Sequence, residues 1–153
     1  MEELVKYLDK LRYHHAEGFW VTYCPDISSE AEIYVQGNEE EISPDHLTLA
    51  KRILSELEHF NDLALTRIDS WLKVDFIEKL IISNIYVFDD VGSVTASPVS
   101  FIITYGYGYE DAKELNELHR RSHPFSLHHL YTVQYSVKFI KNGAVLSTES
   151  WFL

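Results

Sequence analysis

Near its end the chain carries an Asn-Gly pair, Asn142-Gly143, just after residues 129–140, in which apolar and polar side chains alternate. Such alternation is typical of a strand with one face on a core. Asn-Gly is the strongest short signal for a two-residue hairpin turn, because both turn residues take positive φ. The pattern predicts a C-terminal β-hairpin and therefore an antiparallel sheet. The expected facing pairs are Phe139 with Leu146, Val137 with Thr148, and Val133 with Phe152.

Residues 44–72 carry the clearest helix signal in the sequence. Ser43 suits the N-cap position, and Pro44 suits the first helical position, where its missing N–H costs nothing. Apolar residues then recur every three or four positions as far as Trp71, which gives a continuous apolar stripe. One long helix satisfies this stripe. We favour two helices with a break at Asn61-Asp62, because these residues can cap a second helix.

The remaining elements follow from shorter patterns. We expect a helix within 2–16, strands at 19–24, 31–36, 81–89 and 98–107, and a short helix at 112–118. The fold class predicted for residues 1–153 is a single α+β domain. Its antiparallel or mixed sheet of about five strands is covered on one face by the long or broken helix of 44–72.

The formal net charge of −11 restricts the classes of partner. A field of this sign repels phosphates at long range, so binding to nucleic acid or to an anionic membrane is disfavoured. No run approaches the roughly 18 apolar residues of a membrane span, and the N-terminus lacks an apolar signal core. A single cysteine, Cys24, excludes an intramolecular disulfide. These features predict a cytoplasmic protein.

The segment HRRSHPFSLHH, residues 119–129, is rich in histidine. His119 and His123 would share one face if the preceding helix continued, and zinc would be the expected ion for such a pair. A histidine beside Glu114 could instead act as a general base in a small hydrolase or nuclease. Pro124 breaks the pattern, and no spaced second ligand pair confirms it. An exposed polar loop is the favoured interpretation.

Other signatures of catalysis are weak. There is no GxSxG motif, so a serine nucleophile has no support in the sequence, and Cys24 has no basic sequence neighbour, which favours a buried structural role. In the segment TYGYGYED, residues 104–111, three tyrosines would share one face of a strand. A strand end with a bulge is favoured there over a ligand site. We therefore predict no catalytic residue, no metal ligand and no cofactor.

The segment AEIYVQGNEEEISPDHLTLAKRILSELEHFNDLALTRIDSW, residues 31–71, combines a short strand, a polar turn and a long amphipathic helix. In this it resembles small bacterial domains of unknown function, some of which occur as candidate immunity proteins beside secreted toxins. Some of those families carry a Glu-His-Gly stretch near the end, which this chain lacks. The resemblance implies a partner-binding role without chemistry, and no functional residues are carried over from it.

The charge distribution adds to this expectation, because residues 13–50 contain no Lys or Arg but eight acids. We expect a surface for a basic protein, possessing acidic side chains for steering and tyrosines as buried anchors. The function expected is that of an immunity protein against a basic, nuclease-type toxin, and the alternative is the histidine-dependent hydrolase. Apolar side chains near the C-terminus could also form the interface of a homodimer that is built on the last strand. The predicted partner-binding residues are Glu30, Glu32, Tyr34, Glu39, Glu40, Glu41, Tyr107, Tyr109, Asp111 and Glu114.

Overall fold

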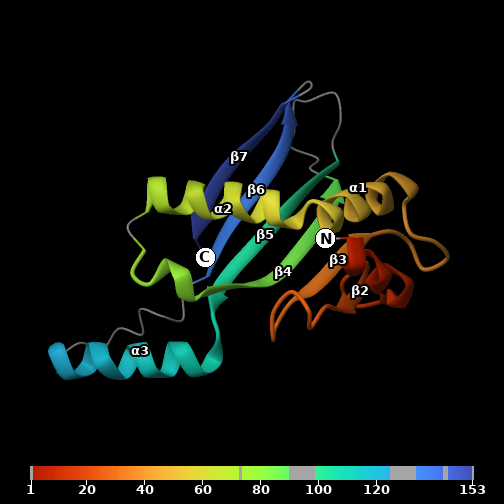
Figure 1. Ribbon diagram of the computed structural model, residues 1–153. Coiled ribbons are helices and arrows are strands. Elements are labelled where there is room, and N and C mark those ends of the chain that lie inside the picture. Colours follow the sequence, from red (N-terminus) through yellow and green to blue (C-terminus); the bar gives the residue numbers. More distant parts are fainter. Residues whose placement is uncertain (1, 73, 90–98, 125–133, 143–144, 153) are drawn as a thin grey trace.

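A computed structural model describes residues 2–72, 74–89, 99–124, 134–142 and 145–152 (Figure 1). Its strands form one seven-stranded sheet in the order β1-β2-β3-β4-β5-β6-β7. Neighbouring strands are antiparallel except for the parallel pair β3–β4. The strands are β1 (Arg12–His14), β2 (Phe19–Tyr23), β3 (Glu32–Gln36), β4 (Leu80–Asp89), β5 (Val99–Tyr107), β6 (Tyr135–Asn142) and β7 (Val145–Phe152).

Helices α1 (Pro44–Ser55) and α2 (Leu57–Trp71) lie across one face of this sheet (Figure 1). They connect β3 to β4, and a parallel strand pair requires a long crossover of this kind. The 3₁₀ helix η1 (Glu2–Lys10) lies beside α1, and η2 (Ile77–Lys79) leads into β4. Helix α3 (Tyr109–Ser122) extends away beyond the end of β5, so no described helix covers the other face of the sheet. We call that face the open face.

The core lies between the two long helices and the sheet. Phe60 of α2 is fully buried and meets the rings of Phe101 and Phe139 edge to face, at centroid distances of 5.1 and 5.6 Å. Phe101 and Phe139 themselves are stacked at 4.5 Å across the β5–β6 pair. The α+β class, the mixed sheet, the helices on one face and the C-terminal hairpin are all confirmed. The strands number seven rather than about five.

One extra strand comes from the N-terminal segment, where the prediction of a helix within 2–16 is wrong after Lys10. The apolar stripe of that helix is buried, but residues 12–14 form β1. Tyr13 pairs with Trp20 across the strands, with ring centroids 5.7 Å apart. Such cross-strand aromatic pairs stabilise a sheet. Gly18, at φ +70°, closes the turn between these strands, a conformation that suits glycine.

The break in the long helix is confirmed, but its predicted position at Asn61-Asp62 is wrong. The helix breaks at Glu56, whose φ of −113° and ψ of 26° separate α1 from α2. Asn61 lies inside α2, where its side-chain oxygen accepts a hydrogen bond from the Tyr105 hydroxyl, at 2.7 Å. A residue engaged with the sheet in this way cannot serve as a helix cap.

The C-terminal hairpin forms with a register different from the predicted one. Phe139 lies opposite Thr148, not Leu146, and Val137 lies opposite Ser150. Tyr135, rather than Val133, is the partner of Phe152. The pair Asn142–Val145 closes the ladder, so Asn142 belongs to the strand, and the residues between them lie outside the described part of the chain. The turn is thus displaced by one residue along the sequence.

Helix α3 is longer than the predicted 112–118. It begins directly after Gly108, has Glu110 and Asp111 in its first turn, and has His119, Arg120 and Arg121 in its last turn. Acids at the start and bases at the end of a helix both favour its dipole. The loop predicted for 119–129 is therefore wrong for residues 119–122. Residues 125–129 of that segment lie outside the described part.

Candidate functional site

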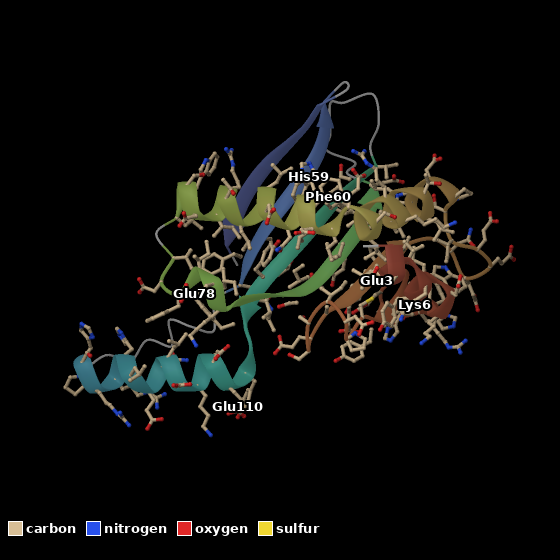
Figure 2. The ribbon with its side chains drawn as sticks, viewed as in Figure 1. Glu3, Lys6, His59, Phe60, Glu78 and Glu110 are labelled. Atoms are coloured by element: carbon tan, nitrogen blue, oxygen red, sulfur yellow. The ribbon has the colours of Figure 1, made fainter. Side chains whose placement is uncertain are left out.

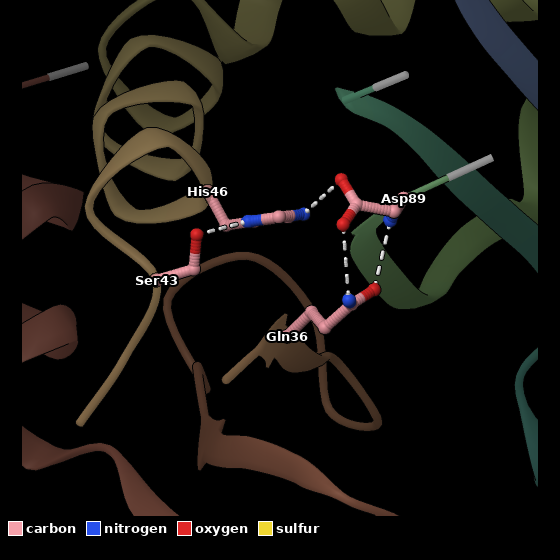
Figure 3. Close-up of polar contacts among 4 residues, drawn as sticks. All are labelled: Gln36, Ser43, His46 and Asp89. Atoms are coloured by element: carbon pink, nitrogen blue, oxygen red, sulfur yellow. Dashed lines mark hydrogen bonds and ion pairs between the residues drawn. The ribbon is translucent and has the colours of Figure 1, made fainter. Parts of the chain in front are cut away.

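A polar network around the buried His46 joins the ends of β3 and β4 to the start of α1 (Figure 3). His46 is 3 % exposed, and its Nδ1 lies 2.5 Å from the Ser43 hydroxyl oxygen. Its Nε2 lies 2.9 Å from Asp89 Oδ1. Gln36 fixes Asp89 twice, because its amide N–H donates to Asp89 Oδ2 at 3.3 Å and its Oε1 accepts the Asp89 backbone N–H at 2.8 Å. The four side chains form one continuous chain of contacts.

The partners of the imidazole favour one tautomer. A carboxylate only accepts hydrogen bonds, so Asp89 favours a proton on Nε2 and leaves Nδ1 free to accept from Ser43. Nε2 lies close to Asp89 Oδ1 but does not make a hydrogen bond of good geometry, so attraction between charges adds to this contact only when the ring is protonated. Hydroxyl, imidazole and carboxylate in this order can remove a proton from the serine. The same contacts hold the helix start on the sheet.

Sequence reasoning missed this network. Ser43 occupies the predicted N-cap position and Pro44 the first helical position, but the Ser43 side chain makes no capping hydrogen bond. The only local signal is the three-residue spacing between Ser43 and His46. Gln36 and Asp89 are 53 residues apart, and nothing in the sequence marks them as partners.

A second constellation lies on the open face of the sheet. Tyr34 of β3 and Tyr86 of β4 are register partners, and their rings stack at 4.3 Å with an interplanar angle of 10°. Phe19 of β2 meets both rings edge to face, at 6.3 and 5.7 Å. All three side chains are partly exposed. Of the three, the sequence analysis proposed only Tyr34, because pairing between strands decides which aromatic residues become neighbours.

Two carboxylates, those of Glu17 and Glu32, act on the tyrosines of this aromatic cluster. The Tyr34 hydroxyl donates a long hydrogen bond of 3.4 Å to Glu32 Oε1. Burial, and after it the negative charge of Glu32, raises the pKa of Tyr34. Burial also raises the pKa of Tyr86, with the charge of Glu17 as the second cause. Both carboxylates are therefore within electrostatic range of the rings. We call Glu17, Phe19, Glu32, Tyr34 and Tyr86 the acidic aromatic cluster.

Three predicted partner-binding residues meet elsewhere, in a shallow hollow at the start of α3. Glu30 of the β2–β3 turn lines it with Tyr109 and Asp111, and Glu110 adds a third carboxylate. Tyr109 is 74 % exposed, and Glu110 projects from the first turn of α3 (Figure 2). Asp111 is partly neutralised, because Lys79 Nζ lies 3.5 Å from its Oδ1. Glu30 and Asp111, which are 81 residues apart in the sequence, thus line the same hollow.

The other predicted residues lie apart from these groups. Glu39, Glu40 and Glu41 are exposed on the turn between β3 and α1, where Asn38 Oδ1 accepts the backbone N–H groups of the last two. Glu114 is exposed on α3.

Tyr107 is buried rather than exposed on the surface. It is only 7 % exposed, and its hydroxyl donates to the backbone oxygen of Asp75. Its role in partner binding stays a prediction.

The histidine pair His119 and His123 does share one side of α3, and the two rings stack at 4.5 Å. Within the described ranges, no group of three or more His, Cys, Asp or Glu side chains is placed to hold a metal ion. His128 and His129 lie outside those ranges. Cys24 is fully buried, as expected, and burial raises the pKa of its thiol to about 12.

Comparisons of the chain with models of protein families, with curated proteins and with solved structures gave no match. Among the described helices, none combines the length and the apolar character needed to cross a membrane.

Proposed function

We propose that the protein is a binding module for a basic protein partner. The observation that carries this proposal is the acidic aromatic cluster on a sheet face that no described helix covers. Tyrosine rings concentrate binding energy at interfaces because they bury much area at little cost in conformational entropy. Carboxylates beside such rings favour a partner that presents lysine or arginine.

The overall charge supports the same class of partner. A net charge of −11 draws a basic protein toward this surface at long range and speeds the encounter. A cytoplasmic immunity protein that neutralises a basic, nuclease-type toxin is the specific form of this proposal. Nuclease toxins grip phosphate with basic residues, and an acidic surface can imitate that phosphate.

The experiment begins with a pull-down from cells that carry the neighbouring genes, followed by association kinetics at several salt concentrations. Tyr34→Ala and Tyr86→Ala should each raise the off-rate and cost about 2 kcal/mol or more of binding free energy. Trp71→Ala is the matched aromatic control, because Trp71 is 57 % exposed on α2, in the helical layer. If the two tyrosine variants bind as tightly as the control, the open face is not the interface.

Charge reversal tests the steering separately. Changing Glu39, Glu40 and Glu41 together to Lys should slow association and flatten its salt dependence. Glu58→Lys on α2 is a control for the smaller, general loss of negative charge. A neutral or acidic partner, or an association rate indifferent to salt, would contradict the electrostatic part of the proposal.

A further inference from the structure

We propose that Ser43 is a nucleophile for acyl transfer, with His46 as its base and Asp89 as the group that orients His46. This goes beyond the binding function and uses a different part of the molecule. It rests on the juxtaposition of the three side chains with Gln36 at the start of α1 (Figure 3). Nucleophile, base and orienting carboxylate are recognised by geometry and role rather than by sequence order.

Ser43 does not cap the helix that follows it. An N-cap serine normally accepts a hydrogen bond from a backbone N–H of the first helical turn. Ser43 stands at that position but makes no such bond, and its hydroxyl is held by His46 at 2.5 Å instead. Ser43 as a residue is partly exposed.

His46 is the proposed base. His46 is buried, and Asp89 favours the tautomer whose Nδ1 accepts the serine proton. When that proton arrives, the imidazolium is stabilised by the carboxylate 2.9 Å away. Gln36 restrains this carboxylate through two hydrogen bonds, which keeps it aimed at the ring. A preoriented carboxylate of this kind is what a serine–histidine pair requires.

The start of α1 provides backbone donors for the negative charge that develops on the substrate. The backbone N–H groups of Asp45 and His46 belong to the first turn of α1, where an α-helix leaves its donors without intrahelical partners. No side chain caps this helix start. Donors at a helix start stabilise a developing oxyanion. Ser43 immediately precedes this first turn, so these N–H groups are the proposed donors to the oxyanion.

The proposed reaction consumes only the ester and one water molecule. The Ser43 oxygen attacks an ester carbonyl as its proton moves to His46 Nδ1, and a tetrahedral intermediate forms. The bond from carbon to the leaving alkoxide breaks, and the alkoxide takes the proton from Nδ1. Water then hydrolyses the acyl-serine by the same proton path. Glu41 and Asp45 are exposed nearby in the sequence, so neutral or cationic esters are favoured over anionic ones.

The test is covalent labelling of the purified full chain with a neutral fluorophosphonate, followed by intact mass and peptide mapping. We expect one adduct, at Ser43. His46→Asn should slow labelling by about a hundredfold or more, because general base catalysis contributes at least that much. Ser70→Ala should leave the rate unchanged, since Ser70 is exposed on α2 and its hydroxyl only donates to the backbone oxygen of Arg67. An unlabelled Ser43 in the folded wild-type protein would overturn the proposal.

A second variant keeps the test decisive if His46→Asn fails to fold. Ser43→Cys retains a nucleophile of similar size beside the same base, and iodoacetamide should alkylate the introduced thiol faster than free cysteine. Cys24 should stay unmodified because it is fully buried. Equal rates for the introduced thiol and free cysteine would show that His46 does not activate this position, and the network would then be structural only.

Discussion

The aromatic centre of the core gives the sharpest test of the fold. Phe60→Ala removes a fully buried ring that touches two others edge to face. A Phe→Ala change in a core costs about 3–5 kcal/mol, and each favourable aromatic pair adds about 0.5–1.5 kcal/mol beyond burial. Two such pairs place the expected loss in the upper part of that range, at about 4–5 kcal/mol.

This loss should be measured by urea denaturation, followed by both tryptophan fluorescence and far-ultraviolet circular dichroism. The midpoint should fall while the slope of free energy against urea stays constant, since the change acts on stability rather than on compactness. For a chain of this length the melting temperature should fall by about 10–15 °C. Leu63→Ala in the same helix is the control, because Leu63 is 40 % exposed, and it should cost under about 1 kcal/mol.

Phe60→Leu separates the two contributions to this loss. Leucine keeps most of the apolar burial but removes the edge-to-face contacts, so the expected loss is about 1–2 kcal/mol. If Phe60→Ala costs less than about 2 kcal/mol, the ring is not held between Phe101 and Phe139, and the placement of α2 on the sheet is wrong.

Three further predictions rest on single side chains. The Cys24 thiol, fully buried with its pKa raised to about 12, should react with a disulfide reagent at pH 8 only after the protein is unfolded. Tyr105→Phe should cost about 1–2 kcal/mol in urea denaturation, because it leaves the side-chain oxygen of Asn61 without its donor. The hydrogen bond from Tyr7 to Asp26, and after it burial, raises the pKa of Tyr7 to about 12. Its stabilising effect should therefore be present below pH 10 and lost as the pH rises through about 12, and ultraviolet titration of Tyr7→Phe should lack one late-ionising tyrosine.

Local signals predicted the elements better than their ends. The stripe of 44–72 and the alternation before Asn142-Gly143 gave the helical layer and the hairpin correctly, because each pattern repeats over many residues. The errors lie where one contact decides between neighbouring positions. Asn61, predicted at the break, lies within α2 and accepts a hydrogen bond from the Tyr105 hydroxyl. The pair Asn142–Val145 gives the hairpin a register that differs from the predicted one.

The candidate sites were less predictable because they depend on pairing between distant segments. Glu32 and Tyr34 were both named from the sequence, and they lie on one face of β3 because residues two apart on a strand share a face. Tyr86 joins them only through the parallel β3–β4 register. The same register brings together the strand ends that carry Gln36 and Asp89, and Asp89 contacts His46.

That parallel pair also has a consequence for how the chain folds. The antiparallel pairs within β1–β3, within β4–β5 and within β6–β7 join strands that follow each other closely in the sequence. The β3–β4 pair must close over residues 37–79, the longest connection between neighbouring strands, and the loss of chain entropy grows with such a span. Contacts of long sequence separation slow folding. The sheet should thus assemble from two parts, β1–β3 and β4–β7. The β3–β4 pairing between these parts should form late, when α1 and α2 pack on both of them.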